Sequence, residues 1–91
     1  MPKVILIAQV NDPVKWEAGF RTHAELFRGY SMKNHVDFTT SGNDSIICME
    51  IEDMDVFQKA MDSQATADAM ALDGVKRETV KMYVLDKRLE L

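Results

Sequence analysis

The chain contains a single cysteine, Cys48, and therefore cannot form an internal disulfide bond. Its place inside an apolar run is typical of a small buried side chain, and no residue that could activate its thiol stands beside it. No apolar run reaches the ~18 residues that a membrane span needs. The short N-terminal run also lacks the longer core and the small-residue cleavage site of a secretory signal. We therefore expect a cytoplasmic protein with no membrane partner.

Basic side chains are also few. The sequence has 11 Lys and Arg residues against 15 Asp and Glu, which gives a net charge of −4 at pH 7. Binding to nucleic acid requires a concentrated basic surface, whereas the basic residues here are scattered among acidic ones. The composition therefore argues against a nucleic acid partner.

Several chemical motifs are missing. The absence of a Gly-rich phosphate loop, a Cys-x-x-Cys pair and a Gly-x-Ser-x-Gly turn argues against nucleotide enzymes, copper chaperones and serine hydrolases. His35 and Asp37 share one face of a predicted strand, but two such ligands fall short of a metal site. A haem group would need an axial ligand, for which only His23 is attractive. We therefore expect neither a metal nor a cofactor.

The 91 residues are enough for one domain, and the hydrophobic content of 46% is that of a folded chain. A run of β-branched residues near 3–10 is apolar on both faces, which predicts a central strand. Apolar and polar residues alternate near 34–41, and a hairpin turn leads into a second two-sided apolar strand near 45–52. The last predicted strand lies near 77–85.

A helix is predicted near 13–28, beginning at Asp12 and Pro13 and ending at Gly29. Gly19 inside it marks a close approach to a neighbouring backbone or to a ligand, and we interpret it as packing. Aromatic residues and one histidine recur in steps of four, three, four and three, which places them on one side of the helix. These residues are Trp16, Phe20, His23, Phe27 and Tyr30.

A second helical segment is predicted near 54–72, with a break near 62–64 at the capping residue Ser63 and an end at Gly74. The resulting order, β-α-β-β-α-β, predicts an α+β, ferredoxin-like domain over residues 1–91. In this arrangement an antiparallel four-stranded sheet carries two helices on one face. Because the predicted strands near 3–10, 45–52 and 77–85 are apolar on both faces, we expect the opposite sheet face to be covered by a second copy of the chain in a homodimer.

Four segments carry a family resemblance: the strand VILIAQV, the helix DPVKWEAGFRTHAELFRGY, the hairpin around SGNDS and the segment DMDVFQKAMDSQATADAMALDGV. Over nearly its full length the chain resembles the dimeric α/β-barrel superfamily. That superfamily includes antibiotic-biosynthesis-type monooxygenases, stress-responsive barrel proteins and muconolactone-isomerase-like proteins. The resemblance implies a ligand cleft between sheet and helices. No catalytic motif of any one member is matched residue by residue. The resemblance therefore implies a fold rather than a particular reaction.

His23 is the sharpest chemical signal. We predict that it is a catalytic general base or a hydrogen-bond donor in a pocket among aromatic residues. The alternative is a half-buried histidine bonded to a backbone carbonyl or a carboxylate. His35 either joins His23 or lies on a solvated strand edge. The predicted ligand-binding residues are Trp16, Phe20, Phe27, His35 and Phe38.

Two functions follow from this site. The first is a cofactor-independent monooxygenase- or isomerase-like enzyme acting on an apolar aromatic or polyketide-like compound. The alternative is a non-catalytic dimeric module that binds a small apolar ligand or serves in a stress response. A second ionisable group near His23, inside one pocket, is the feature that would separate them.

Overall fold

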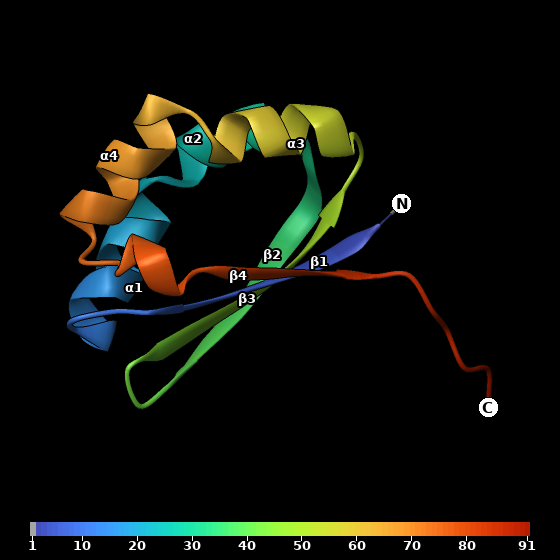
Figure 1. Ribbon diagram of the computed structural model, residues 1–91, viewed down its shortest axis with the longest axis horizontal. Coiled ribbons are helices and arrows are strands. Elements are labelled where there is room, and N and C mark those ends of the chain that lie inside the picture. The colour runs from blue at the N-terminus through green and yellow to red at the C-terminus, as the bar shows by residue number, and fades with distance from the viewer. Residues whose placement is uncertain (1) are drawn as a thin grey trace.

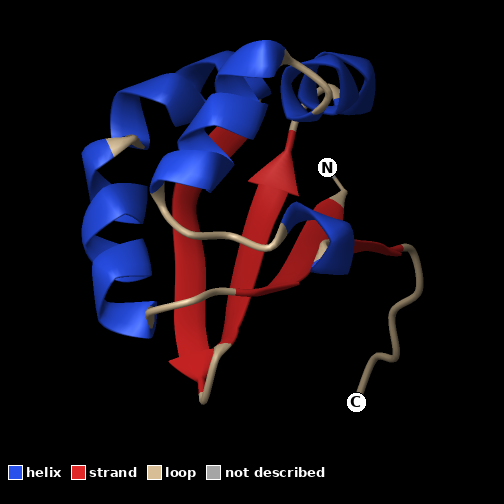
Figure 2. Ribbon diagram, turned by 60° about the vertical axis from the view of Figure 1, so that its left-hand side comes forward, coloured by secondary structure: helices blue, strands red, loops and turns tan. Residues whose placement is uncertain are grey.

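The computed structural model describes residues 2–91 and confirms the predicted ferredoxin-like α+β architecture (Figure 1). The strand order is β2-β3-β1-β4, and every neighbouring pair is antiparallel. The helices lie together on one face of the sheet (Figure 2). The elements are β1 (Lys3–Gln9), α1 (Pro13–Thr22), α2 (Ala24–Phe27), η1 (Arg28–Tyr30), β2 (Met32–Ser41), β3 (Asp44–Ile51), α3 (Met54–Met61), α4 (Gln64–Leu72), η2 (Arg77–Thr79) and β4 (Lys81–Leu85).

The first helical segment begins as predicted but is not one helix over residues 13–28. The Asp12 carboxylate accepts hydrogen bonds from the backbone N–H groups of Val14 and Lys15, at 3.0 and 3.2 Å. α1 ends at Thr22 because the N–H of the next residue, His23, is shared between the carbonyls of Gly19 and Phe20 and tightens the last turn. His23 thus lies at the junction of α1 and α2.

The prediction that Gly29 ends this segment is wrong. The chain continues through η1 and leaves it at Ser31, which has a left-handed φ of 62°. β2 therefore begins at Met32, two residues before the predicted start. A bulge between Lys33 and Val36 explains the difference, because it interrupts the alternation on which the prediction depended.

The predicted break in the second helical segment is confirmed. α3 ends at Met61, and the Ser63 hydroxyl oxygen accepts the Thr66 N–H at the start of α4. The predicted last strand is too long, since residues 77–79 form the short helix η2. The Thr79 hydroxyl donates a hydrogen bond to the Lys76 carbonyl at 2.6 Å and accepts one from the Gln9 N–H at 2.9 Å. The second of these bonds holds the turn beside β1.

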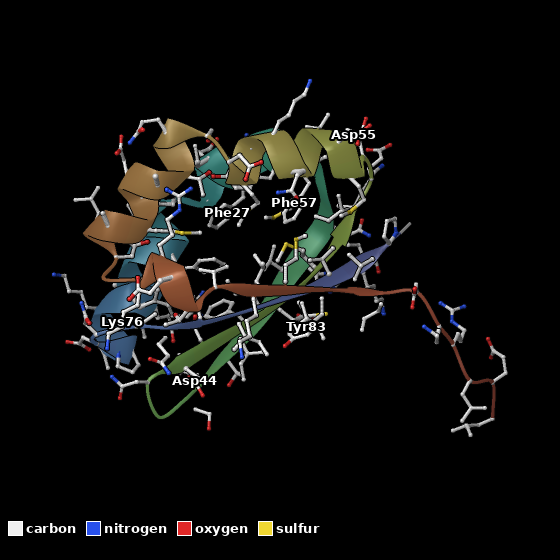
Figure 3. The ribbon with its side chains drawn as sticks, viewed as in Figure 1. Phe27, Asp44, Asp55, Phe57, Lys76 and Tyr83 are labelled. Carbon is white, nitrogen blue, oxygen red and sulfur yellow. The ribbon has the colours of Figure 1, made fainter. Side chains whose placement is uncertain are left out.

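The core lies between the sheet and the helices. Val4, Met49 and Ile51 on the sheet are almost fully buried there, as is Phe57, which points inward from α3 (Figure 3). The buried strand residues alternate with residues that point away from the helices.

The opposite sheet face has an apolar centre that no helix of the described chain covers. Ile5 pairs with Cys48 on β3 and with Tyr83 on β4, and these three residues point away from the helices. Tyr83 is 50% exposed. Its side chain is labelled in Figure 3. Cys48 is half-buried on this face rather than buried in the core as expected. Within residues 2–91 no helix has the length and apolarity to cross a membrane.

Candidate functional site

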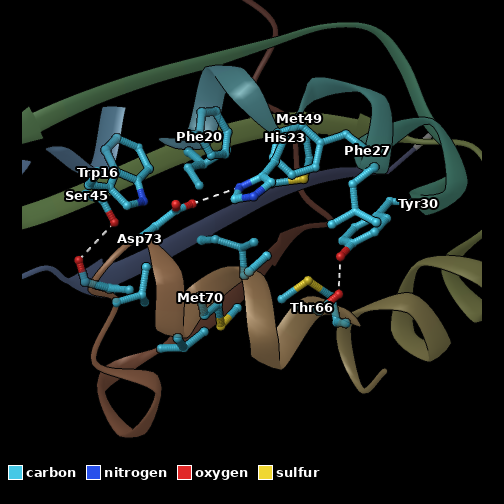
Figure 4. A pocket seen from close by; sticks show the side chains of 18 of the residues that line it. Trp16, Phe20, His23, Phe27, Tyr30, Ser45, Met49, Thr66, Met70 and Asp73 are labelled. Carbon is cyan, nitrogen blue, oxygen red and sulfur yellow. Dashed lines mark hydrogen bonds and ion pairs between the residues drawn. The ribbon is translucent and has the colours of Figure 1, made fainter. Parts of the chain in front are cut away.

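A cavity of about 90 Å³ lies between the first helical segment, α4 and the sheet (Figure 4). All five residues of the predicted stripe line it. Trp16 and Phe20 stack with their ring centroids 4.9 Å apart, and Phe27 continues the aromatic wall at 4.8 Å from Phe20. The sheet and α4 supply most of the remaining wall, with further residues from α2, α3 and the segment after α4, and this wall is mostly apolar. The stripe predicted from the sequence thus forms one wall of this cavity.

His23 is paired with Asp73 on the wall of this cavity. Its Nδ1 lies 3.0 Å from the Asp73 Oδ2, and the two side chains are 25% and 11% exposed. Because a carboxylate only accepts hydrogen bonds, the neutral imidazole carries its proton on Nδ1 and its lone pair on Nε2. Nε2 has no hydrogen-bond partner among residues 2–91. The pair therefore presents a positioned base.

The position of Asp73 depends on two glycines. Asp73 follows the last residue of α4, and Gly74 after it has a φ of 72°, a left-handed value that ends the helix as predicted. Gly19 faces the Asp73 carboxylate so closely that a methyl group at Gly19 would overlap it. The close approach that we interpreted as packing is therefore made by the carboxylate that holds His23.

A second polar group lies at the Tyr30 end of the cavity. The Tyr30 hydroxyl contacts the Thr66 hydroxyl, and both residues are buried. The Thr66 hydroxyl in turn donates to the Ala60 carbonyl at 2.6 Å. This chain of hydroxyls links η1 to the junction of α3 and α4, so it joins the two halves of the helical layer.

The structure does not bring His35 to His23. His35 lies on β2 and pairs with Asp37 at 3.4 Å, and both side chains are more than 70% exposed. It lines a separate groove of about 360 Å³ beside α1 and α2. The bulge that begins β2 and the alternation of that strand turn His35 towards solvent.

Phe38 also lines this outer groove rather than the cavity. Its ring meets Trp16 and Phe20 edge-on, with centroids 5.8 and 5.1 Å away, and so supports the cavity wall from behind. Phe20, Phe27 and Met32 line both spaces and separate the groove from the cavity.

Sequence reasoning missed Asp73, Thr66 and the role of Tyr30. Asp73 has no local pattern that distinguishes it from the other acidic residues of the chain. The signal that could have found it is the pair of Gly19 and Asp73, since a glycine within a helix often marks a close neighbour. Among residues 2–91 no group of three or more His, Cys, Asp or Glu residues is placed to hold a metal ion.

Comparison by sequence gives no relatives, as no protein-family model and no curated protein matches the chain. Comparison with solved structures finds proteins of similar fold. SnoaB, a cofactor-independent oxygenase from Streptomyces nogalater, superposes with a TM-score of 0.71 at 16% identity, covering 99% of this chain and 95% of that one. A Bordetella bronchiseptica protein assigned as an antibiotic biosynthesis monooxygenase gives a TM-score of 0.76 at 18% identity, with 97% of each chain covered.

A further structural match has a description that names no activity. A protein from Arabidopsis thaliana superposes with a TM-score of 0.64 at 19% identity over 100% of both chains. At these identities the likeness concerns the backbone and carries no residue roles across. The resemblance expected from the sequence is confirmed at this level: the chain has the ferredoxin-like fold of the antibiotic-biosynthesis-monooxygenase-like proteins.

Proposed function

We propose that the protein is a cofactor-independent, base-assisted oxygenase of a small apolar aromatic compound with an acidic hydroxyl group. The observation that carries this proposal is the pairing of His23 with Asp73 on the wall of an apolar cavity. Asp73 is the second ionisable group that separates a catalytic site from a plain binding module. A histidine oriented by a carboxylate is a recurrent arrangement for general bases in enzymes.

The chemistry begins with proton transfer. His23 Nε2 takes the proton of the bound hydroxyl group, and the Asp73 carboxylate stabilises the imidazolium that forms. The aromatic wall of Trp16, Phe20 and Phe27 excludes water from the electron-rich anion. The anion then reacts with dioxygen: one oxygen atom enters the ring, the other leaves as water, and the substrate supplies all the electrons. With hydroquinone, the products are hydroxybenzoquinone and water.

The size of the cavity limits the ligand. At about 90 Å³ it is smaller than an engineered cavity of roughly 150 Å³ that accommodates benzene, and well below the roughly 300–1,000 Å³ of drug-sized sites. Met32, Met49 and Met70 are among its lining residues, and flexible methionine side chains can move to admit a ring. The volume therefore favours a single-ring compound over the polyketide-like compound that the sequence also suggested.

The structural neighbours support the reaction type. SnoaB is described as a cofactor-independent oxygenase and shares this fold. An enzyme that works without a cofactor depends on its own side chains to make the substrate reactive, and the His23–Asp73 pair is suited to that task. Fold alone does not assign function. We therefore propose oxygenase activity for this chain because it combines this fold with the His23–Asp73 pair.

The proposal is tested by screening single-ring phenols and dihydroxybenzenes for protein-dependent oxygen uptake, with product identification by mass spectrometry. Uptake matched by a product one oxygen atom richer is the expected result. Substrate loss without oxygen uptake would point to isomerisation instead. Binding without any turnover across the screen would contradict the enzymatic proposal and leave the non-catalytic binding module.

A further inference from the structure

The outer groove beside α1, α2 and β2 carries positive charge without negative charge. Its charged lining residues are Arg21, Arg28, Lys33 and His35, and no Asp or Glu among residues 2–91 lines it. Acidic residues outnumber Lys and Arg in the chain by 15 to 11, so this surface has the opposite sign to the molecule as a whole. We propose that the groove is a second binding site, which takes a small aromatic compound that carries a carboxylate. This site goes beyond the chemistry proposed for the cavity and does not depend on it.

The cations are scattered in the sequence, and the fold brings them together. Arg21 lies in the last turn of α1, Arg28 begins η1, and Lys33 lies near the start of β2. The chain turns from η1 into β2 at the left-handed residue Ser31, and Lys33 then lines the same groove as the two arginines. We call Arg21, Arg28 and Lys33 the cationic rim.

The rest of the lining is mostly apolar and aromatic. Phe27 and Phe38 both contact Phe20, with ring centroids 4.8 and 5.1 Å from it, so the three rings form one connected surface. The remaining apolar lining residues are Ala24, Met32 and Val36. The groove volume of about 360 Å³ falls within the roughly 300–1,000 Å³ of small-molecule sites. The groove therefore has room for an aromatic ring system with a charged substituent.

Arg21 is held over this aromatic surface with hydrogen-bond donors to spare. Its guanidinium carbon lies 5.0 Å from the centre of the Phe38 ring, which is a cation–π contact. Its Nε donates to the Glu17 carboxylate at 3.1 Å. Within residues 2–91 no hydrogen bond uses the N–H groups of its two terminal nitrogens. These N–H groups can form the paired hydrogen bonds that a planar carboxylate accepts.

The ion pairs already present are weak competitors for the ligand. Arg28 pairs with Glu25 at 3.2 Å and Lys33 with Glu52 at 3.5 Å, and all four side chains are at least 41% exposed. Exposed pairs contribute little free energy because water and salt screen them. An aromatic carboxylate adds apolar burial against the rings to its ionic contacts, so it can draw these cations from their present partners.

This arrangement distinguishes an aromatic acid from its neutral amide. 2-Naphthoate can place its rings on the phenylalanine surface and its carboxylate within the cationic rim. 2-Naphthamide has nearly the same shape but no charge. Because hydrogen bonds to charged groups are stronger than neutral ones, we expect the acid to bind roughly fivefold more tightly in dilute buffer. The preference should disappear at about 1 M salt, where electrostatic interactions reach only about 3 Å.

The test titrates the isotope-labelled protein with 2-naphthoate and with 2-naphthamide and follows the backbone amide signals by NMR. The acid is expected to shift the signals of residues 33–38. The double variant Arg21→Gln/Lys33→Gln should bind the acid and the amide equally. The matched control is Lys15→Gln/Lys59→Gln, which removes two positive charges from exposed positions outside the groove and should keep the preference. The same spectra report whether each variant is folded.

Three results would overturn the inference. The first is equal binding of acid and amide by the parent protein, or no binding of the acid at millimolar concentration. The second is an unchanged preference in Arg21→Gln/Lys33→Gln. The third is a set of shifts confined to Ala69, Met70 and Asp73, which line the cavity and not the groove. None of these results bears on the oxygen uptake that tests the proposed function, so the two proposals fail separately.

Discussion

Gly19 of α1 and Asp73 at the end of α4 share one small volume: the carboxylate of Asp73 occupies the space that a side chain at Gly19 would fill. The two residues are 54 positions apart in the sequence and meet only because α1 and α4 lie side by side on the sheet. Since the same carboxylate holds His23, a residue with no side chain helps to set the geometry of the proposed base.

Gly19→Ala is therefore expected to damage the site. Alanine would raise helix stability by about 1 kcal/mol through propensity alone, but its methyl group displaces the Asp73 carboxylate from His23. The lost charge-assisted hydrogen bond, worth about 1.5–3 kcal/mol, outweighs the gain. Urea denaturation is expected to report a lower free energy of unfolding. The matched control is Gly29→Ala, where an added methyl group meets nothing within 4 Å and a gain of about 0.4–1 kcal/mol is expected.

Asp73→Asn tests which ring nitrogen of His23 carries the proton. An amide in place of the carboxylate can donate to Nδ1, which moves the imidazole proton to Nε2 and removes the base from the cavity. Turnover is expected to fall by about 10⁴-fold, as for the equivalent change in a serine protease triad. Nitrogen NMR of the imidazole should show the change of tautomer, while the exposed control Asp68→Asn leaves both the spectrum and the turnover unaltered. An Asp73→Asn protein with parental turnover would rule out the role given to Asp73.

Phe57→Ala tests the packing of the core. Phe57 is fully buried between α3 and the sheet, and truncation of such a side chain costs about 3–5 kcal/mol. The neighbouring Val56→Ala is the control, because Val56 is 43% exposed and its truncation should cost far less. Both values come from urea denaturation. Equal losses for the two variants would contradict the described core.

The dimer remains a prediction, which the open sheet face supports. Ile5 and Ile7 lie on that face, half-buried, beside the exposed Tyr83. We expect sedimentation equilibrium to give twice the 10.4 kDa chain mass at micromolar concentration. Ile7→Lys should yield the monomer, whereas Val14→Lys, at an 81% exposed position of α1, should not. A parent protein of 10.4 kDa would contradict the prediction.

Sequence patterns predicted most of the fold because each element carries its own local signal. Asp12 with Pro13, and Ser63, mark helix starts by chemistry that acts within a few residues, and the structure places the caps there. The errors occur where distant contacts decide the backbone. The turn at residues 77–79 depends on the hydrogen bond between Thr79 and Gln9, and no local pattern reports such a bond.

The residues of the candidate site also differ in whether local sequence could predict them. The stripe from Trp16 to Tyr30 follows from helical spacing and lines the cavity as expected. Asp73 and Thr66 could not be predicted because they lie on the other helical segment, and their meeting with His23 and Tyr30 depends on how α4 packs against α1. His35 is the opposite case. It was a candidate site residue only because it is a histidine, and the orientation of β2 turns its side chain towards solvent.

The central claim is that His23 is the base of the cavity, and the most direct test is the initial rate of oxygen uptake by His23→Gln. Glutamine keeps the side chain polar but cannot take the proton. The substrate is any single-ring phenol that the parent protein oxidises. We expect the rate to fall by about 10²–10⁴-fold with the fold intact by circular dichroism, while His35→Gln, which changes the histidine of the outer groove, retains the parental rate. Equal rates for His23→Gln and His35→Gln would contradict the claim.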